Sequence, residues 1–268
     1  MMNRQAGVGL VAGRGRLPFD ALQEIKSRGY RAVVVGLAGE VDPEIAQKAD
    51  DFQLLPAGKL GSIIETFHRQ AVKEVVFAGK VGKEALFQGG FDPLCQALLA
   101  SLPQKNDDAV LLAIVEAFEK QGIHVAKQTD YLRHLLAPAG MRLGEISAVE
   151  NGDLQLGFRM AKVSGELDIG QSVIVKNGVV LAVEAIEGTD QAILRGGTLG
   201  GPGAVVVKVS KPKQDERFDV PTVGLSTLQS MITARAGVLG IEAAKTLIVA
   251  KEEFLDLAAR HGLKIVAL

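Results

Sequence analysis

The sequence Val8-Gly-Leu-Val-Ala-Gly-Arg-Gly-Arg-Leu-Pro18 decides the fold. It begins with an apolar run typical of a buried parallel strand and continues into a glycine-rich loop. A helix is expected over 17–27, with Pro18 in its first turn, where the missing N–H costs nothing. A second apolar run, Arg31-Ala-Val-Val-Val-Gly-Leu37, follows. This order predicts a βαβ unit and therefore a Rossmann-like parallel α/β domain at the amino terminus.

The glycine loop Gly13-Arg-Gly-Arg-Leu17 leaves backbone amides free at a helix amino terminus, where an anion can bind. Its spacing is not the dinucleotide fingerprint, because Pro18 stands where the third glycine belongs. No acidic residue stands at Val35-Gly-Leu37, so an NAD site is not predicted. The loop is a candidate site for a nucleotide or a sugar phosphate, and a plain tight turn is the alternative.

A second loop of this kind, with Gly79 and Lys80, closes a strand expected over 74–81. Because the carboxyl ends of parallel strands lie at one edge of a sheet, we expect the two loops to line one crevice. The alternative for Lys80 is a surface charge. Further elements of this domain are a strand expected over 51–55 and helices expected over 60–72, 92–99 and 109–120.

The domain boundary is expected where helix and strand periods are lost, around Pro138 and Gly140. This places a first domain at 1–134, a linker at 135–150 and a second domain at 151–268. The second domain is predicted to be mixed α/β. Its clearest feature is a hairpin that turns on Asn177-Gly178.

The charged segment Lys211-Pro-Lys-Gln-Asp-Glu-Arg-Phe-Asp-Val-Pro-Thr-Val-Gly224 lies between an expected strand and a helix expected over 225–236. Open α/β folds carry their chemistry in loops at strand ends. Asp219 has Lys213 and Arg217 near it in sequence, which suits a metal or phosphate site. The alternative is a solvated loop in which Asp219 bonds its own backbone.

Composition excludes several classes of function. The 268 residues carry a net charge of −1, so no basic surface is available for a nucleic acid. Tryptophan is absent and there are 2 tyrosines, which leaves few stacking platforms for bases. The single cysteine, Cys95, fits a reducing cytoplasm and is expected to be a small buried residue. No apolar run reaches the roughly 18 residues of a membrane span.

The candidate chemistry rests on carboxylates. The four histidines are scattered without metal-ligand spacing, so a zinc site is not predicted. Carboxylates at expected strand ends and helix caps are Glu184, Glu187, Asp190, Asp219, Asp107 and Asp108. Oxygen ligands on loops suit Mg²⁺ or Mn²⁺, with substrate phosphates completing the coordination shell. The residues alone therefore indicate phosphoryl chemistry on a nucleotide-like substrate.

Six segments in order along essentially the whole chain resemble the LpxI-type UDP-2,3-diacylglucosamine pyrophosphatases. They are Gly9-Leu-Val-Ala-Gly-Arg-Gly-Arg-Leu-Pro18, Phe77-Ala-Gly-Lys-Val81, Lys105-Asn-Asp-Asp108, Leu167-Asp-Ile-Gly-Gln171, Leu181-Ala-Val-Glu-Ala-Ile-Glu-Gly-Thr-Asp190 and the charged segment 211–224. The set is specific, although no single segment is. One departure is Lys80, because a member of the family has asparagine in that place.

The resemblance implies two domains with an interdomain active-site cleft. It implies hydrolysis of the pyrophosphate bond of UDP-2,3-diacylglucosamine to UMP and 2,3-diacylglucosamine 1-phosphate (lipid X), a step of lipid A biosynthesis, with Mg²⁺ or Mn²⁺. It also implies a cytoplasmic protein peripherally associated with the inner membrane of Gram-negative bacteria, with a homodimer left open. A non-catalytic nucleotide- or lipid-binding regulator is the alternative from another class, and a phosphosugar transferase is a third.

The family's essential aspartate lies in an R-x-D-x-P-T motif, which maps onto Asp219. We therefore expect Asp219, with Asp190 and Glu187, to be catalytic, and Asp219 and Asp190 to bind the metal. The candidate substrate-binding residues are Gly13, Gly15, Leu17, Pro18, Gly79, Lys80, Val81, Asp107, Asp108, Gly188, Thr189 and Thr222.

Overall fold

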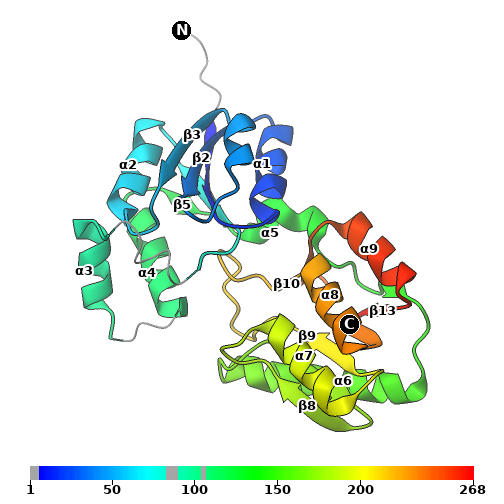
Figure 1. Ribbon diagram of the computed structural model, residues 1–268. Coiled ribbons are helices and arrows are strands. Elements are labelled where there is room, and N and C mark those ends of the chain that lie inside the picture. Colours follow the sequence, from blue (N-terminus) through cyan, green and yellow to red (C-terminus); the bar gives the residue numbers. More distant parts are fainter. Residues whose placement is uncertain (1–5, 83–89, 104–106) are drawn as a thin grey trace. The chain divides into compact units, whose positions relative to one another are not determined.

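The apolar run near the amino terminus forms β1 (Gly7–Ala12), the middle strand of a five-stranded sheet with the order β3-β2-β1-β4-β5. The computed structural model describes residues 6–82, 90–103 and 107–268. Every strand pair in this sheet is parallel, and the other strands are β2 (Arg31–Leu37), β3 (Asp51–Leu55), β4 (Glu74–Ala78) and β5 (His124–Val125). The predicted Rossmann-like parallel sheet is confirmed (Figure 1).

Helices and short 3-10 segments complete the first half of the chain. They are α1 (Leu17–Ser27), η1 (Pro43–Gln47), α2 (Leu60–Arg69), α3 (Pro93–Ser101), α4 (Asp107–Lys120), α5 (Gln128–Leu132) and η3 (Arg133–Leu135). Helix α2 ends before the expected residue 72 because Ala71 takes a positive φ of 55°. Strand β4 stops at Ala78 rather than at residue 81, because Gly79 turns the chain with a φ of 95°.

Alternate side chains of the strands face different helices. Val33 and Val35 point into a core that includes Phe67 of α2 and Phe118 of α4. The rings of Phe67 and Phe118 lie 6.1 Å apart, between their centroids. Helix α1 buries Pro18, Ala21, Leu22 and Ile25. Covering both faces by helices is what a parallel sheet of nearly continuous apolar strands requires.

A segment from much later in the sequence belongs to this first compact unit, which consists of residues 1–133 together with Glu216–Phe218. Phe218 packs against the same core cluster. The Gln128 N–H donates to the Glu216 carbonyl at 2.7 Å, and Lys127 pairs with the Glu216 carboxylate at 2.8 Å. The sequence analysis did not predict this return of the chain.

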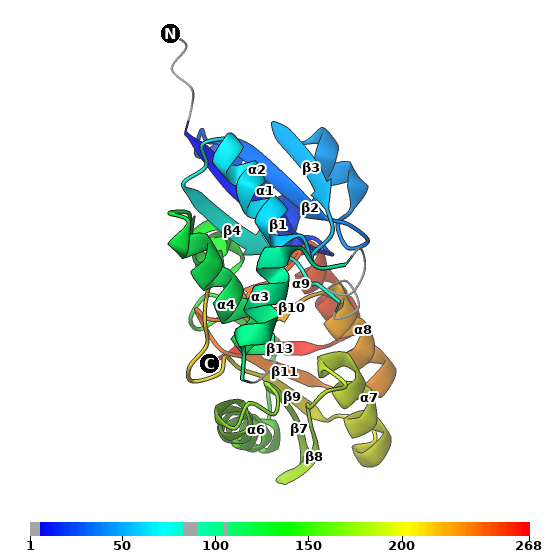
Figure 2. The ribbon, with the colours of Figure 1, turned by 90° about the vertical axis from the view of Figure 1, so that its left-hand side faces the viewer.

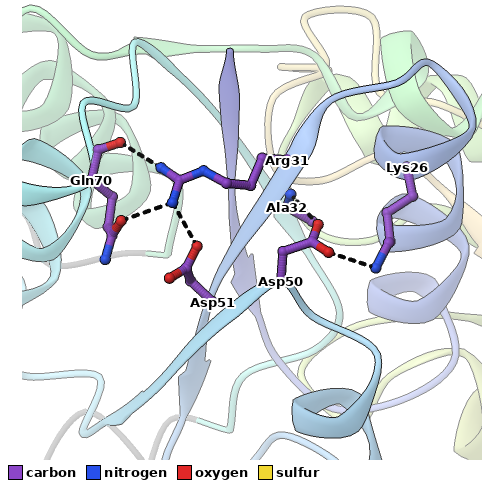
Figure 3. Close-up of polar contacts among 6 residues, drawn as sticks. All are labelled: Lys26, Arg31, Ala32, Asp50, Asp51 and Gln70. Carbon is purple, nitrogen blue, oxygen red and sulfur yellow. Dashed lines mark hydrogen bonds and ion pairs between the residues drawn. The ribbon is translucent and has the colours of Figure 1, made fainter. Parts of the chain in front are cut away.

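Polar contacts join the amino ends of strands to neighbouring helices in the first unit (Figure 3). Arg31 Nη1 donates to Asp51 Oδ2 at 2.7 Å and to Gln70 Oε1 at 3.0 Å, which connects β2, β3 and the end of α2. Asp50 accepts from the Ala32 N–H at 2.8 Å and from Lys26 Nζ of α1 at 2.9 Å. Burial would raise the pKa of Asp50, but the Ala32 N–H and the Lys26 ammonium hold it below its usual value.

The second compact unit, residues 134–215 and 219–268, contains a six-stranded sheet with the order β6-β13-β11-β9-β7-β8. Three strands of this sheet pair parallel with one another: β9 (Val205–Lys208), β11 (Val238–Ile241) and β13 (Lys264–Ala267). The other three pair antiparallel with their neighbours: β6 (Arg142–Leu143), β7 (Ser172–Lys176) and β8 (Val179–Val183). A separate parallel pair is formed by β10 (Thr222–Val223) and β12 (Leu247–Ile248). This confirms the predicted mixed α/β domain.

Helices cover both faces of the six-stranded sheet, and Figure 2 shows α6 and α7 with the sheet strands between them. On one face Leu154 of α6 (Ala148–Glu166) packs with Val173 and Val207. On the other face Ile193 packs with Ile174. The helices on that face are α7 (Thr189–Gly200), α8 (Leu225–Ala234) and α9 (Lys251–Arg260).

Some details of this second unit differ from the expectations. The hairpin turns on Asn177 and Gly178, both with positive φ, as predicted. Residues 135–150, expected to be a linker, include β6 and the first turn of α6, which Ser147 and Glu150 cap reciprocally. Strand β11 was not predicted, because Gly240 interrupts its apolar run. The structure shows all four residues buried.

Replacing Asp50 with asparagine should lower the free energy of unfolding by about 1 kcal/mol at pH 7, because it removes a charged acceptor that serves two donors. Since the folded pKa is lowered, the carboxylate stabilises the fold above its unfolded pKa of about 4. The difference from wild type should vanish as the pH falls through the lowered folded value. Urea unfolding between pH 7 and pH 3 measures this.

The matched control is Glu65→Gln on the exposed side of α2, which should change the free energy of unfolding by less than about 0.5 kcal/mol. A difference between Asp50→Asn and wild type that stayed constant down to pH 3 would contradict the assignment.

Candidate functional site

The two glycine loops of the first unit are hydrogen-bonded to each other. The Gly13 N–H donates to the Ala78 carbonyl at 2.8 Å. Arg14 and Lys80 form a bridge in which each N–H donates to the other's carbonyl, at 2.7 Å and 2.9 Å. The two loops therefore lie side by side at the carboxyl ends of β1 and β4. That they line one crevice stays a prediction.

This close approach depends on glycine at two positions. A Cβ added to Gly13 would lie 2.5 Å from the Lys80 carbonyl oxygen. Gly79 has a φ of 95°, and a Cβ there would lie 2.8 Å from the Gly13 carbonyl carbon. Both contacts are shorter than a side chain can tolerate, so the pairing of the loops requires the two glycines.

A buried carboxylate also holds the two loops. Glu40, which is 8% exposed, accepts from Arg14 Nη2 at 2.7 Å and Nε at 3.0 Å. Its other oxygen accepts from the Gly82 N–H at 3.1 Å. A cavity of about 1080 Å³ lies beside these groups, and its lining includes Arg14, Gly15, Arg16, Asp20, Lys26 and Glu40. The first unit thus offers cations and backbone amides beside an open space.

Other predicted binding residues of the first unit have varied surroundings. Leu17 and Pro18 form the first turn of α1, where Pro18 is buried, and Val81 is 44% exposed. Asp108 lies in the first turn of α4. Asp107 begins α4, but its side chain lies outside the described part of the structure, as do residues 104–106 of the same motif.

Asp219 in the second unit accepts from side chains that come from two different loops. Its Oδ2 accepts from Gln171 Nε2 at 3.2 Å and from Gln214 Nε2 at 3.1 Å. Lys211 Nζ lies 3.7 Å from the same oxygen and donates to Asp168 Oδ1 at 2.6 Å. The Asp219 side chain remains 42% exposed. The carboxylate is thus held by side chains and still accessible.

The sequence analysis assigned no role to Gln171, Gln214 or Lys211. Gln171 and Lys211 both lie in segments that carry the family resemblance. Gln171 directly precedes β7, and Lys211 lies three residues after the end of β9. That position was the signal available in the sequence. Their convergence on Asp219 depends on the pairing of β7 with β9, which the sequence pattern does not specify.

Thr189 lies in a second polar cluster, at the start of α7. Its hydroxyl donates to Glu184 Oε1 at 2.9 Å and accepts from Lys208 Nζ at 2.9 Å. Glu184 Oε2 is buried and has no hydrogen-bond partner among the described residues. The residue before Thr189, Gly188, has a φ of 80° and begins the helix. Glu184, Thr189 and Lys208 therefore form a connected set at the carboxyl ends of β8 and β9.

Glu187 and Asp190 were predicted to be catalytic with Asp219. Glu187 is exposed and accepts from Arg195 Nη2 at 2.6 Å, and this hydrogen bond lowers its pKa. Asp190 lies in the first turn of α7. Among the described residues, no three or more histidine, cysteine, aspartate or glutamate side chains form a group that could hold a metal ion. The roles of Glu187 and Asp190 stay predictions, and so does that of Thr222, whose hydroxyl donates to the Val220 carbonyl at 3.0 Å.

A hard divalent cation at Asp219 would take part of its shell from elsewhere. The polar groups that face Asp219 Oδ2 are donors, namely the amide nitrogens of Gln171 and Gln214 and, at 3.7 Å, the Lys211 ammonium. Among these groups the Asp219 carboxylate would be the ligand, and Mg²⁺ commonly keeps waters and substrate phosphates as its other ligands.

These features define a two-domain α/β protein. Its candidate anion site is the pair of glycine loops beside a cavity, and its candidate cation site is the held, accessible carboxylate of Asp219. Residues 7–135 match the family model described as the LpxI N-terminal domain, and residues 139–266 match the LpxI C-terminal domain. The chain belongs to the LpxI family, which confirms the resemblance found in the sequence.

A curated relative from Caulobacter vibrioides is named UDP-2,3-diacylglucosamine pyrophosphatase LpxI. It is 32% identical over 280 aligned residues, which cover 97% of this chain and 96% of the relative. In the described part of the chain, no helix combines the length and the apolar character needed to cross a membrane.

Solved structures give weaker likenesses. A UDP-glucose-4-epimerase from Stenotrophomonas maltophila is 15% identical, with a TM-score of 0.31 over 44% of this chain and 34% of its own. A biotin carboxylase from Campylobacter jejuni is 14% identical, with a TM-score of 0.29 over 73% of this chain and 42% of its own. Neither TM-score supports an inference about this protein.

The clash distances at the glycine loops predict a specific loss of stability. Gly13→Ala and Gly79→Ala should each lower the free energy of unfolding by about 1–3 kcal/mol, because the backbones must separate to admit a methyl group. The matched control is Gly152→Ala in α6, where an added Cβ meets nothing within 4 Å. That variant should be unchanged or stabilised by about 0.5–1 kcal/mol. Urea unfolding of the three variants measures the difference, and a Gly13→Ala variant as stable as Gly152→Ala would contradict the prediction.

Proposed function

We propose that this protein hydrolyses the pyrophosphate bond of UDP-2,3-diacylglucosamine and releases UMP and 2,3-diacylglucosamine 1-phosphate (lipid X), a step of lipid A biosynthesis. The observation that carries the proposal is the match of both LpxI domains, together with a relative of that name that is 32% identical over 97% of the chain. The held carboxylate of Asp219, at the aspartate of the family motif, supports it.

In this reaction the oxygen of water bonds to one phosphorus, the anhydride P–O bond on that phosphorus breaks, and the other phosphate leaves with the shared oxygen. The proposed role of Asp219 is to hold the cation, with waters and phosphate oxygens as its other ligands. When bound, Mg²⁺ or Mn²⁺ supplies charge stabilisation at the phosphate oxygens. Lys211, held between Asp168 and Asp219, adds a cation at the same place. Asp190 and Glu187 are candidates for a second ligand or for the base that orients water.

The proposed phosphate contacts of the first unit are its two glycine loops. Backbone amides at the amino terminus of a helix favour an anion, and Gly15 and Leu17 of the loop before α1 are the proposed contacts there. The Gly13 N–H is already taken by the Ala78 carbonyl, so the proposed role of Gly13 is to let the two loops pair. Lys80 on the paired loop adds a positive charge. In the second unit Gly188, Thr189 and Thr222 are the corresponding candidates.

The proposed substrate is a diacylated lipid with a nucleotide head, so we also propose that the protein acts at the cytoplasmic face of the inner membrane of Gram-negative bacteria as a peripheral protein. Homodimer formation stays a prediction.

The proposal predicts UMP release from UDP-2,3-diacylglucosamine by the purified protein, and loss of this activity in Asp219→Ala. We expect kcat to fall by at least about a hundredfold while the melting temperature is retained, because the carboxylate is exposed enough to be removed without a cavity. Asp256→Asn, on the exposed side of α9, is the control and should keep full activity.

A non-catalytic binder would release no UMP, and a transferase would release it only with an acceptor. An Asp219→Ala variant that is folded and retains a near-normal rate would remove this residue from the reaction.

Chelation tests the proposed cation separately. Exhaustive treatment with EDTA should abolish UMP release, and added Mg²⁺ or Mn²⁺ should restore it, because a carboxylate ligand such as Asp219 favours these ions. The melting temperature should change little, so that lost activity is not lost folding. Full turnover after chelation would show that the protein works without a divalent cation.

A further inference from the structure

Glu242 is a buried carboxylate at the carboxyl end of β11 that has no part in the proposed reaction. The residue is 7% exposed. Its Oε2 accepts from Lys162 Nζ of α6 at 2.7 Å and from the Ser210 N–H at 2.9 Å. Its Oε1 lies 3.0 Å from Lys245 Nζ. Burial would raise its pKa, but the two ammonium groups and the Ser210 N–H hold it below the usual value.

A buried ion pair contributes little net stability, because the cost of taking both charges out of water offsets their attraction. This pair also supplies hydrogen bonds, because apolar residues in its place would leave a buried backbone N–H and carbonyl without partners. The pair therefore fixes the position of that backbone. The groups that the pair fixes are the N–H and the carbonyl of one residue.

That residue is Ser210, which lies two residues after the end of β9 and directly before the charged segment. Glu242 accepts from its N–H, and Lys162 Nζ donates to its carbonyl at 2.8 Å. Lys162 lies one helical turn before Gly165, where an added Cβ would lie 3.3 Å from the Lys211 Cα. The ion pair and the glycine together hold the start of the segment against α6.

Short contacts lead from Ser210 to Asp219. The N–H of the next residue, Lys211, donates to Gln214 Oε1 at 3.1 Å, and Gln214 Nε2 donates to Asp219 Oδ2 at 3.1 Å. On the other side of Ser210, the Val209 N–H donates to the Gln171 carbonyl at 3.0 Å. Gln171 Nε2 in turn donates to Asp219. The groups that hold the Asp219 carboxylate are thus anchored on both sides of Ser210.

We propose that the Lys162–Glu242 pair positions Asp219, by fixing Ser210 so that Lys211, Gln214 and Gln171 keep their places around the carboxylate. Glu242 is a positioning residue, since it is separated from Asp219 by these side chains. The inference rests on the proposed function, in which Asp219 holds the cation for hydrolysis.

Glu242→Gln tests the pair because it keeps the shape of the side chain and removes its charge. We expect kcat for UMP release to fall about tenfold to a hundredfold, because misplacing a reacting group by about 1 Å costs up to that much. KM should stay within about threefold, since uniform binding of the substrate is not altered.

Glu150→Gln is the matched control. Glu150 pairs with Lys264 Nζ at 2.8 Å through both oxygens, in the same unit but at the amino end of β13. The control should lower the melting temperature by a similar amount and leave kcat unchanged. A merely stabilising ion pair at Glu242 would behave in the same way as this control.

Limited proteolysis supplies a measurement that does not depend on turnover. Trypsin can cut after Lys213 and after Arg217, both within the charged segment. Glu242→Gln should be cut there several times faster than wild type, and Glu150→Gln should not. Should Glu242→Gln not fold, Lys162→Met is the second variant, because Glu242 then keeps Lys245 as a partner; it should show the same changes.

Wild-type kcat and wild-type cleavage rates in the folded variant would overturn the inference. If wild-type protein released no UMP at all, the proposed function would fail, and the cleavage rates alone would decide whether the pair fixes the segment.

Discussion

The hydrogen bonds to the Asp219 carboxylate are the interaction on which this account of the site depends. Gln171 and Gln214 donate to one of its oxygens, and each donor is anchored to backbone next to Ser210. Just before Asp219 the chain contributes Glu216–Phe218 to the first unit, where Phe218 joins the core. The aspartate is thus held at a point where both its side chain and its preceding backbone are constrained. A carboxylate fixed in this way would lose little further freedom on binding the proposed cation, which is the benefit of preorganisation.

In the first unit, stabilising polar contacts lie at the amino ends of the parallel strands, and the candidate binding loops lie at the carboxyl ends. At the amino ends of the strands, Arg31 and Asp50 make polar contacts that join neighbouring strands and helices. At the carboxyl ends, Gly13 and Gly79 let two loops pair closely, and Arg14, Gly15 and Arg16 of the first loop line a cavity. This division follows from parallel topology, because all loops that follow strands meet at one edge. It explains why the candidate binding residues are glycines and cations.

Much of the fold could be predicted from the sequence because its local signals are strong. Helix α1 has the predicted bounds, and the hairpin turns on Asn177-Gly178. Strand β11 was missed because Gly240 interrupts its apolar run, and no local pattern indicates that Phe218 belongs to the first unit. The candidate site shows the same difference between local signals, which the sequence carries, and tertiary contacts, which it does not. Asp219 could be singled out through its motif, whereas its partners Gln171 and Lys211 are set by tertiary contacts. The expected joint site of Asp219, Asp190 and Glu187 rested on counting carboxylates, and no group of three such side chains suited to a metal exists among the described residues.

The most direct test of the central claim is to run the reaction in water enriched in ¹⁸O and to analyse both products by mass spectrometry. Hydrolysis of the pyrophosphate bond predicts one solvent oxygen in either UMP or the diacylglucosamine phosphate, and none in the other product. The labelled product identifies the phosphorus that water attacks. Failure to form either product, or formation of UMP with a lipid phosphate joined to an acceptor and no solvent oxygen in either product, would contradict the assignment of this protein as a pyrophosphatase.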